Sequence, residues 1–392
     1  RRYPRDWLRT LLLSHSRSPQ SSPSSSTTTT ASLPAYDDPT LIGKALAVAP
    51  MVDQSDLPFR LLCRRYGSNI CWTPMIHARL FCTNPRYREK FWNWGGASWA
   101  KDGVGGMPAE DRPLIAQFCG SDPEYMLEAM RAVQHHVDGV DINCGCPQGI
   151  ARKGRYGAFL LEEADDLVDL VGHLAPRLDV PLSVKVRILP SGVEDSLDLY
   201  VRLIEAGAAM ITVHGRNRHQ KGPETGEADW DAIRRVREHP EIGGKVPVLA
   251  NGGIGNLDDV RRCLSHTNCD GVMSSEGILE YPVLFTETGT LSASSLRTGP
   301  GRVRIAREYL DLARRYPTDE GGQGSGVKCV RIHLHRFLHA DLQTNPKWRD
   351  AVSNNEGTLD TLSEVLDEIE AAHGRDGHRV EEEKMSWYMR HR

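Results

Sequence analysis

The sequence predicts an α/β protein, a (β/α)8 TIM barrel followed by a smaller all-helical domain. Between residues 44 and 274, short apolar runs alternate with longer amphipathic ones. There are about eight such units over about 240 residues, which is the count and length of a (β/α)8 barrel. Each short run is apolar throughout, as expected for parallel strands covered on both faces. A doubly wound sheet is the competing fold, but near-equal repeats without a GxGxxG turn argue against it.

The predicted strands are short apolar runs at 45–49, 70–73, 114–118, 139–143, 182–187, 210–213, 246–250 and 271–274. Stretches with helical spacing lie between most of them, at 57–66, 123–136, 164–174, 195–206, 229–238 and 257–265. Strand and helix therefore alternate through residues 41–295, which we expect to form one barrel domain.

From residue 302 onward the pattern is helical, with helices predicted at 302–315, 327–340 and 357–373. A glycine-rich stretch, 321–326, separates the first two and is expected to be a flexible linker or loop. Residues 300–375 are thus a predicted helical domain, and 376–392 a polar tail.

Residues 1–40 are rich in Arg and Ser and include a Ser/Thr tract. Such a composition cannot bury a core, so we expect a disordered extension. An Arg- and Ser-rich start with few acids also resembles a mitochondrial transit peptide. We expect a location in the cytoplasm, the nucleus or both, and the mitochondrion is the alternative.

The composition excludes several classes of protein. The net charge is −4, so any nucleic-acid surface must be a local one. The cysteines include no CxxC pair, which argues against a zinc ribbon or a secreted disulfide framework and favours a reducing compartment. No apolar run reaches the roughly 18 residues of a membrane span. We expect no metal and no membrane partner.

In a barrel, the chemical side chains lie where the strands end, at the carboxyl-terminal mouth. Polar, cationic or glycine residues follow nearly every predicted strand, at 49–51, 117–120, 143–146, 185–187, 214–216, 251–253 and 274–277. One or two such ends would be ordinary capping, but seven in succession indicate one shared site.

The last two strand ends have the composition of a phosphate site. Asn251, Gly252 and Gly253 follow the seventh strand, and Glu276 and Gly277 follow the eighth. Barrels commonly hold a phosphate here, because free backbone N–H groups and a helix start favour an anion. Two tight turns are the alternative reading. We favour phosphate, bound in the case of Glu276 by its backbone N–H.

Lys185 ends a strand where its side chain would point into the mouth, and a lysine there needs an anionic partner. One candidate is the electron-rich edge of a flavin ring, to which Gln117 could also hydrogen-bond. The alternative is a salt bridge with Asp141. Arg187 and Arg216 add cationic donors for phosphate or pyrimidine oxygens. Beside them, His214 becomes a candidate substrate or cofactor contact.

Cys146 lies between Gly145 and Pro147 on a loop beyond a strand. Cysteine is usually a small core residue, but a Gly-Cys-Pro turn is a poor core position, so a reactive role is favoured. A thiol with an ordinary pKa of about 8.5 is protonated at neutral pH and can act as a general acid. Cys144 is interpreted as structural.

Two cationic clusters are candidate contacts for an RNA backbone. The first is Arg152, Lys153 and Arg155, just beyond the cysteine loop, and the second is Lys328, Arg331 and Arg336 on a predicted helix. A solvated cationic face is an equal alternative for either cluster taken alone.

The stretch NCGCPQGIARKGRYGAFL, from Asn143 to Leu160, resembles the active-site signature of the tRNA-dihydrouridine synthases. Its form is similar to the eukaryotic branch that reduces uridines 16 and 17 of the tRNA D-loop. The resemblance extends over about residues 41–345 and is weaker in the helical appendage. Cys144 departs from the family pattern, which more often has a bulky apolar residue there, and this concerns packing rather than chemistry.

The resemblance implies an FMN enzyme reduced by NADPH or NADH, with tRNA as partner. The flavin N5 would deliver hydride to uracil C6 and Cys146 would protonate C5, with the uridine flipped out of its stack. Asn143 and Arg187 would lie near the target base. The residues that map onto FMN contacts are Ala49, Pro50, Met51, Gln117, Lys185, His214, Asn251, Gly252, Gly253, Glu276 and Gly277.

Two other functions compete with this one. The first is a flavin-dependent reductase of small pyrimidines or enoates on the same barrel, and the second is a tRNA-binding flavoprotein without catalysis. The basic residues after Cys146 and the cationic appendage favour RNA over a small molecule. We expect the protein to be a monomer.

Overall fold

The computed structural model describes residues 3–16, 38–92, 108–286, 293–320 and 322–374. Eight parallel strands close into a barrel, because β2 pairs with both β1 and β4 and completes the ring. The barrel strands are β1 (Ala45–Val48), β2 (Ile70–Trp72), β4 (Leu114–Cys119), β5 (Gly139–Cys144), β6 (Leu182–Arg187), β7 (Met210–His214), β8 (Val248–Asn251) and β9 (Gly271–Ser274). The predicted (β/α)8 barrel is confirmed.

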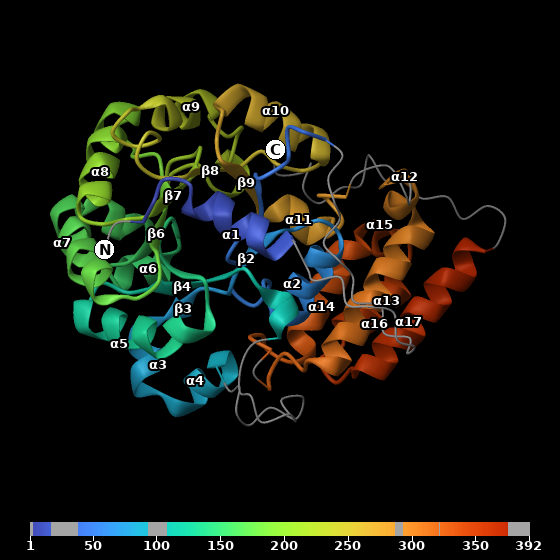
Figure 1. Cartoon of the computed structure of the whole chain (residues 1–392). Coiled ribbons are helices and arrows are strands. Elements are labelled where there is room, and N and C mark those ends of the chain that lie inside the picture. The colour runs from blue at the N-terminus through green and yellow to red at the C-terminus, as the bar shows by residue number, and fades with distance from the viewer. Residues whose placement is uncertain (1–2, 17–37, 93–107, 287–292, 321, 375–392) are drawn as a thin grey trace, which may run out of the picture.

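Helices surround the ring (Figure 1), and the six that were predicted follow their strands in the expected order, whereas the helices at 78–83, 85–92, 149–153 and 276–280 were not predicted. The surrounding helices are α2 (Leu57–Arg65), α3 (Ala78–Thr83), α4 (Pro85–Trp92), α5 (Pro123–Val133), α6 (Gly149–Lys153), α7 (Ala164–Leu174), α8 (Val193–Glu205), α9 (Trp230–Glu238), α10 (Leu257–Thr267) and α11 (Glu276–Glu280). Short 3-10 turns supplement them at Ala109–Asp111, Gln134–His136, Gly157–Glu162, Ala175–Arg177 and Gly222–Glu224.

Most strand bounds agree with the prediction to within a residue, since every residue of β4 and β5 is buried and the apolar signal is unbroken. Strand β8 begins two residues later than predicted, directly after Pro247, which has no amide hydrogen for the sheet. The two-residue strand β3 (Ile76–His77) was not predicted. It pairs with Phe118 and Cys119 of β4, farther along the edge of β4 that also pairs with β2.

Residues 3–16 of the amino-terminal segment are ordered, so the predicted disorder is wrong for this part of the chain. They contain α1 (Trp7–Ser16), whose Leu8 and Leu12 are only 2% and 5% exposed. Both leucines pack with inward-facing residues of the strands, among them Met210 and Leu249. The predicted disorder of 17–37 lies outside the described residues. An apolar stripe of leucines is therefore enough to fold this short basic segment onto the barrel.

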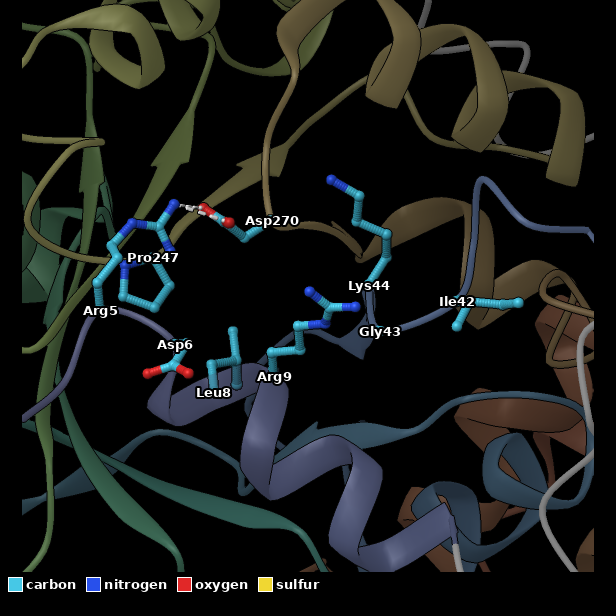
Figure 2. Close-up of a pocket in the computed structure, with 9 residues that line it drawn as sticks. All are labelled: Arg5, Asp6, Leu8, Arg9, Ile42, Gly43, Lys44, Pro247 and Asp270. Atoms are coloured by element: carbon cyan, nitrogen blue, oxygen red, sulfur yellow. Dashed lines mark hydrogen bonds and ion pairs between the residues drawn. The ribbon is translucent and has the colours of Figure 1, made fainter.

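Helix α1 covers the end of the barrel opposite the mouth, here called the floor (Figure 1). Trp7 Nε1 donates to the Ala209 carbonyl, 2.9 Å away, just before β7. Figure 2 shows Arg5 reaching Asp270, where both carboxylate oxygens lie 2.8 Å from the guanidinium. Arg9 and Lys44 line a pocket of ≈ 330 Å³ beside this pair. The floor is thus held by apolar burial and by paired charges.

The carboxyl-terminal residues form a helical bundle against one side of the barrel (Figure 1). Its helices are α12 (Ala293–Arg297), α13 (Gly299–Arg315), α14 (Val327–Phe337), α15 (His339–Thr344), α16 (Pro346–Ser353) and α17 (Leu359–His373). Helix α16 was not predicted. Helix α13 lies against α2 and α17, and α14 against α11. The bundle and the barrel share one continuous hydrophobic core, in which Phe59 of α2 stacks on Phe337 of α14.

The glycine-rich stretch between α13 and α14 packs against the barrel over its described residues, 322–326. Gln323 is fully buried and its Nε2 donates to the Phe91 carbonyl, 3.1 Å away. The Gly322 carbonyl accepts from the Leu57 amide at 2.9 Å. Of the two expected forms, a flexible linker or a loop, these residues adopt the loop, and it is packed against the barrel. Within the described parts of the chain, none of the helices is long and apolar enough to cross a membrane.

Candidate active site

The register of the strands brings the predicted polar residues together at the mouth. Asn143 lies opposite Lys185 across β5 and β6, and Arg187 lies opposite His214 across β6 and β7. His214 in turn lies opposite Asn251 on β8. Because neighbouring parallel strands end at the same edge, four consecutive strands contribute side chains to one surface.

One wall of the mouth is a buried hydrogen-bond chain. Asn143 Nδ2 donates to Gln117 Oε1 at 2.9 Å, and Gln117 Nε2 donates to Asp141 at 2.7 Å. Asp141 also accepts from the Ser183 hydroxyl at 2.6 Å. Burial raises the pKa of Asp141 to about 6, although these hydrogen bonds oppose the shift. The chain fixes the orientation of both amide side chains, Gln117 and Asn143.

Lys185 does not form the salt bridge with Asp141 that was weighed as an alternative. Its Nζ donates to Asn251 Oδ1, 2.8 Å away, and Asn251 Nδ2 donates to the Met273 carbonyl at 2.8 Å. Lys185 is thus aimed across the mouth toward β8, the strand that precedes the predicted phosphate loop. An ammonium held by a neutral amide keeps its charge available to a ligand.

Cationic groups crowd this side of the mouth. Burial lowers the pKa of Lys185 to about 8, and the nearby Arg187 adds to the shift. Burial also lowers the pKa of Arg187 to about 10, with repulsion from Arg216 as the next cause. The pKa of His214 lies well below its usual value, because of burial and then of Arg187, Lys185 and Arg216. His214 is therefore neutral at physiological pH, and the cluster would be relieved by an anion.

The loop that carries Cys146 is held in one conformation. Asn143 Oδ1 accepts from the backbone amides of Gly145 at 3.2 Å and Cys146 at 3.0 Å. Arg187 Nε donates to the Gly145 carbonyl at 2.7 Å. Gly157 lies so close that a Cβ there would be 2.6 Å from the Cys146 carbonyl oxygen, and its φ is +68°. Only glycine satisfies both conditions, which explains the glycine that follows Tyr156 in this stretch.

The two neighbouring cysteines differ in their environment. Cys144 ends β5 and is buried, as predicted for a structural residue, whereas Cys146 is partly exposed. Cys146 packs beside Cys119 and Tyr156. Sequence reasoning missed Tyr156, which lies within the same stretch as the cysteine and was indistinguishable there from a core aromatic. A partly exposed thiol on a rigid loop can present a proton to a bound group.

Three further predicted cofactor residues line the start of the ring. The amide of Ala49 donates to the Ser274 carbonyl at 3.0 Å, which joins the ends of β1 and β9. Pro50 and Met51 follow, and Met51 is partly buried against the barrel core. The Ser55 hydroxyl contacts both the amide and the carbonyl of Met51, at 3.0 and 3.2 Å. This apolar edge faces a mouth that is otherwise polar.

The glycines of the predicted phosphate loop have a reason in packing as well. A Cβ at Gly252 would lie 2.9 Å from the His214 ring, and one at Gly277 would lie 2.4 Å from the Ile254 carbonyl oxygen. Glycine is thus required by the close approach of the chain to itself. The cationic cluster, rather than these glycines, is the structural argument for an anion at the mouth.

The predicted RNA contacts fall into two groups. Arg152, Lys153 and Lys328 are exposed, and Arg155 is also exposed but lies 3.5 Å from Asp166. Two side chains on α14 contact the protein instead. Arg336 pairs with Glu276 of α11 at 2.6 Å, and Arg331 donates to backbone carbonyls at the end of α16. Glu276, predicted to face a phosphate through its amide, thus uses its carboxylate to hold α14.

The mouth fits an anionic flavin nucleotide on three observations. Lys185, Arg187 and Arg216 lie together, and the pKa values of Lys185 and Arg187 are lowered by burial first and then by repulsion from a neighbouring arginine. The amides of Gln117 and Asn143 are held in a fixed orientation in the wall of the mouth, and Pro50 and Met51 add an apolar side. A phosphate-bearing, planar and polar-edged ring such as FMN matches this combination of donors. The arrangement can hold an anion beside a proton-donating thiol.

Comparison with known proteins agrees with this chemistry. The family model described as "Dihydrouridine synthase (Dus)" matches residues 47–373. The tRNA-dihydrouridine(16/17) synthase NAD(P)(+)-like protein of Mus musculus is 38% identical over 344 residues, which are 88% of this chain and 65% of the mouse protein. The tRNA-dihydrouridine(16/17) synthase NAD(P)(+) of Saccharomyces cerevisiae is 43% identical over 299 residues, 76% of this chain and 67% of the yeast protein.

A relative from another branch is less similar. The tRNA-dihydrouridine(20a/20b) synthase NAD(P)+-like protein of Homo sapiens is 34% identical over 243 residues, 60% of this chain and 69% of the human protein. The match to the mouse relative covers less than two thirds of that protein's own length, 65%. The family model spans most of the present chain, including the barrel and the helical bundle. The chain belongs to the dihydrouridine synthase family.

Proposed function

We propose that the protein is an FMN-dependent tRNA-dihydrouridine synthase that reduces the C5–C6 double bond of D-loop uridines, at positions 16 and 17, with NADPH or NADH. The observation that carries the proposal is the position of Cys146. It is a partly exposed thiol on a loop fixed by Asn143, Arg187 and Gly157, beside a cationic mouth. The names of the mouse and yeast relatives support the choice of substrate and positions.

When bound, reduced FMN supplies a hydride for C6 of the uracil ring. The chain then has to deliver a proton to C5, and Cys146 is the group placed for this as a general acid. The thiol becomes a thiolate, which the nearby Arg187 and Lys185 stabilise by their charge. Asn143 holds the loop amide of Cys146 and so sets the direction of the thiol.

Other residues of the mouth bind rather than react. Lys185, His214, Arg216 and Asn251 would hold the anionic and polar edges of FMN. Arg187 would also contact the base. The target uridine has to leave its stack to reach a site at the bottom of the mouth. The exposed Arg152, Lys153 and Lys328 would neutralise tRNA phosphates, which positions the D-loop without reading its sequence.

The test is an assay with unmodified tRNA transcript, purified protein, FMN and either NADPH or NADH. We expect dihydrouridine in the D-loop at positions 16 and 17, mapped by sequencing. Free uridine and dihydroorotate are offered in parallel. Turnover of the small molecules without turnover of tRNA would contradict the proposal and favour a small-molecule reductase, and tight tRNA binding without product would favour a non-catalytic flavoprotein.

A further inference from the structure

A buried carboxylate joins the barrel to the helical bundle. Asp56 is fully buried at the start of α2, where its side chain caps the helix by accepting from the Phe59 amide at 2.7 Å. Its Oδ2 accepts from the Tyr309 hydroxyl at 2.9 Å and from Cys329 Sγ at 2.8 Å. His333 Nε2 lies 3.3 Å from the same oxygen. One barrel residue therefore collects three side chains from α13 and α14.

The charge of Asp56 depends on these partners. Burial opposes ionisation, but His333 and the hydrogen bonds from Cys329 and Phe59 outweigh it, so the pKa of Asp56 lies below its usual value. An ionised carboxylate without such partners would be expensive to bury. The bundle thus supplies the hydrogen-bond donors and the histidine that stabilise the Asp56 carboxylate. Separating the bundle from the barrel would leave this buried charge without them.

The same residue types could in principle bind a metal ion, since Asp56, Cys329 and His333 place one ligand atom each within 4.8 Å of one another. The contacts argue otherwise. Tyr309, Cys329 and His333 all approach the same single oxygen of Asp56, at 2.9, 2.8 and 3.3 Å. The group is arranged around an anion rather than around a cation.

The contact continues directly to the mouth. The carbonyl oxygen of Asp53, three residues earlier, lies 2.9 Å from Cys329 Sγ and shares its single S–H with Asp56, and the Asp53 carboxylate accepts from the Ser325 hydroxyl at 2.6 Å. This turn follows the Pro50–Met51 edge of the mouth on β1. At its other end, α14 is held by the pair of Arg336 with Glu276 on α11. Helix α14 is therefore tied to two different segments of the mouth.

We propose that Asp56, Tyr309, Cys329 and His333 form a positioning clasp that fixes the helical bundle, and the tRNA bound to it, in register with the mouth. The proposal rests on the proposed function and adds to it the element that decides which uridine arrives at Cys146. If the bundle moved by a few ångströms relative to the barrel, a neighbouring nucleotide of the tRNA would reach Cys146, since the mouth itself would accept any uracil.

The experiment uses the full chain with Tyr309→Phe, Asp56→Asn and Cys329→Ala. Asparagine still caps α2, so Asp56→Asn removes the charge and retains the cap. We expect the KM for tRNA to rise by about tenfold or more, the effect of losing one hydrogen bond to a charged group. Dihydrouridine should also spread to neighbouring D-loop positions, whereas tRNA-independent NADPH oxidation by oxygen should be unchanged.

Two controls separate the possible outcomes. Cys263→Ala alters an equally buried cysteine on α10 of the barrel wall and should change none of these quantities. Limited proteolysis of the 317–326 segment measures contact between bundle and barrel without any activity, and cleavage should be faster in the clasp variants. If the unaltered chain forms no dihydrouridine, the proposed function fails while proteolysis still tests the clasp.

Three results would overturn the clasp. The first is an unchanged KM, an unchanged distribution of products and an unchanged rate of proteolysis in folded Asp56→Asn and Tyr309→Phe. The second is a parallel loss of tRNA turnover and NADPH oxidation, which would indicate a general effect on folding. The third is stoichiometric zinc in the purified protein, lost in Cys329→Ala. If Asp56→Asn does not fold, Tyr309→Phe decides, because it removes a single hydroxyl.

Discussion

The two ends of the barrel treat charge in opposite ways. At the mouth, burial lowers the pKa of Lys185 to about 8 and that of Arg187 to about 10, and repulsion from Arg187 and from Arg216, respectively, adds to the two shifts. At the floor, Arg5 pairs with Asp270, and Arg112 pairs with Asp138 at 2.7 Å. The same strands thus begin beside paired charges and end beside a cluster of cationic side chains.

The amino-terminal ends of the strands therefore contribute to stability, and the carboxyl-terminal ends of the same strands contribute to function. The floor is completed by the chain itself, through the leucines of α1 and the ion pairs. The mouth keeps an electrostatic cost that a bound anion would remove, as is usual where a fold gives up stability for a site. Substitutions at the floor should therefore alter unfolding, and substitutions at the mouth should alter binding and turnover.

The largest effect is expected at the floor. Leu8→Ala and Leu12→Ala should each lower the free energy of unfolding by about 2–5 kcal/mol, because each empties a buried site. Denaturant titration measures this, with the 36% exposed Leu13→Ala as the matched control. FMN binding per folded molecule should not change. If Leu8→Ala and Leu13→Ala lose the same stability, α1 is not part of the core.

The next effect is expected at the mouth. Cys146→Ala should reduce dihydrouridine formation by about 10²-fold or more, the usual loss for a general acid. Bound FMN and tRNA affinity should remain. Product formation is measured in single turnover with prereduced flavin, and Cys144→Ala serves as the neighbouring control that should retain turnover. Unchanged product in Cys146→Ala would remove the acid assignment.

The affinity of the mouth for FMN should depend on pH, because Lys185 titrates near the physiological range. The pKa of Lys185 is about 8 in the ligand-free protein. An anion bound beside it would return that pKa toward the usual lysine value, so binding above pH 8 takes up a proton. FMN affinity should then fall by up to about tenfold per pH unit above pH 8. Fluorescence titration of apoprotein measures it, and Lys185→Met should abolish the slope.

The smallest effect concerns the rim. Arg152→Gln and Lys153→Gln should each lower the slope of log affinity for tRNA against log salt by about one, with little change in turnover of bound tRNA. Arg5→Gln, at the floor, should leave the slope as it is. Equal slopes in the rim and floor variants would mean that the tRNA does not pass over Arg152 and Lys153.

The sequence was sufficient wherever the signal was local and unbroken. The apolar runs of β4 and β5 and the chemistry-bearing strand ends could be placed because a barrel converts chain order into position. Partners could not be placed in this way. Lys185 donates to Asn251 rather than pairing with Asp141, and Arg336, predicted to contact RNA, pairs with Glu276. These choices depend on side-chain direction in three dimensions, which spacing along the chain does not encode.

Helix α1 was missed for a different reason. Its leucines form an apolar stripe, but a short basic segment beside a Ser/Thr tract has the composition of a disordered region. The leucines of this stripe become buried only against the floor of the barrel, which the local sequence does not reveal. The role of His333 could not be predicted either, because its partner Asp56 is more than 270 residues away in the sequence and only the fold brings the two side chains together.

The floor helix has a consequence for processing of the chain. A peptidase that removes an amino-terminal targeting sequence also removes any contacts that this sequence makes in the folded protein. Here cleavage after Ser16 would take away Leu8, Leu12 and Trp7, and would expose the inner ends of the strands to water. The segment can therefore be a cleaved targeting sequence or a permanent part of the floor, but not both. A molecule that has lost it would have an uncovered floor.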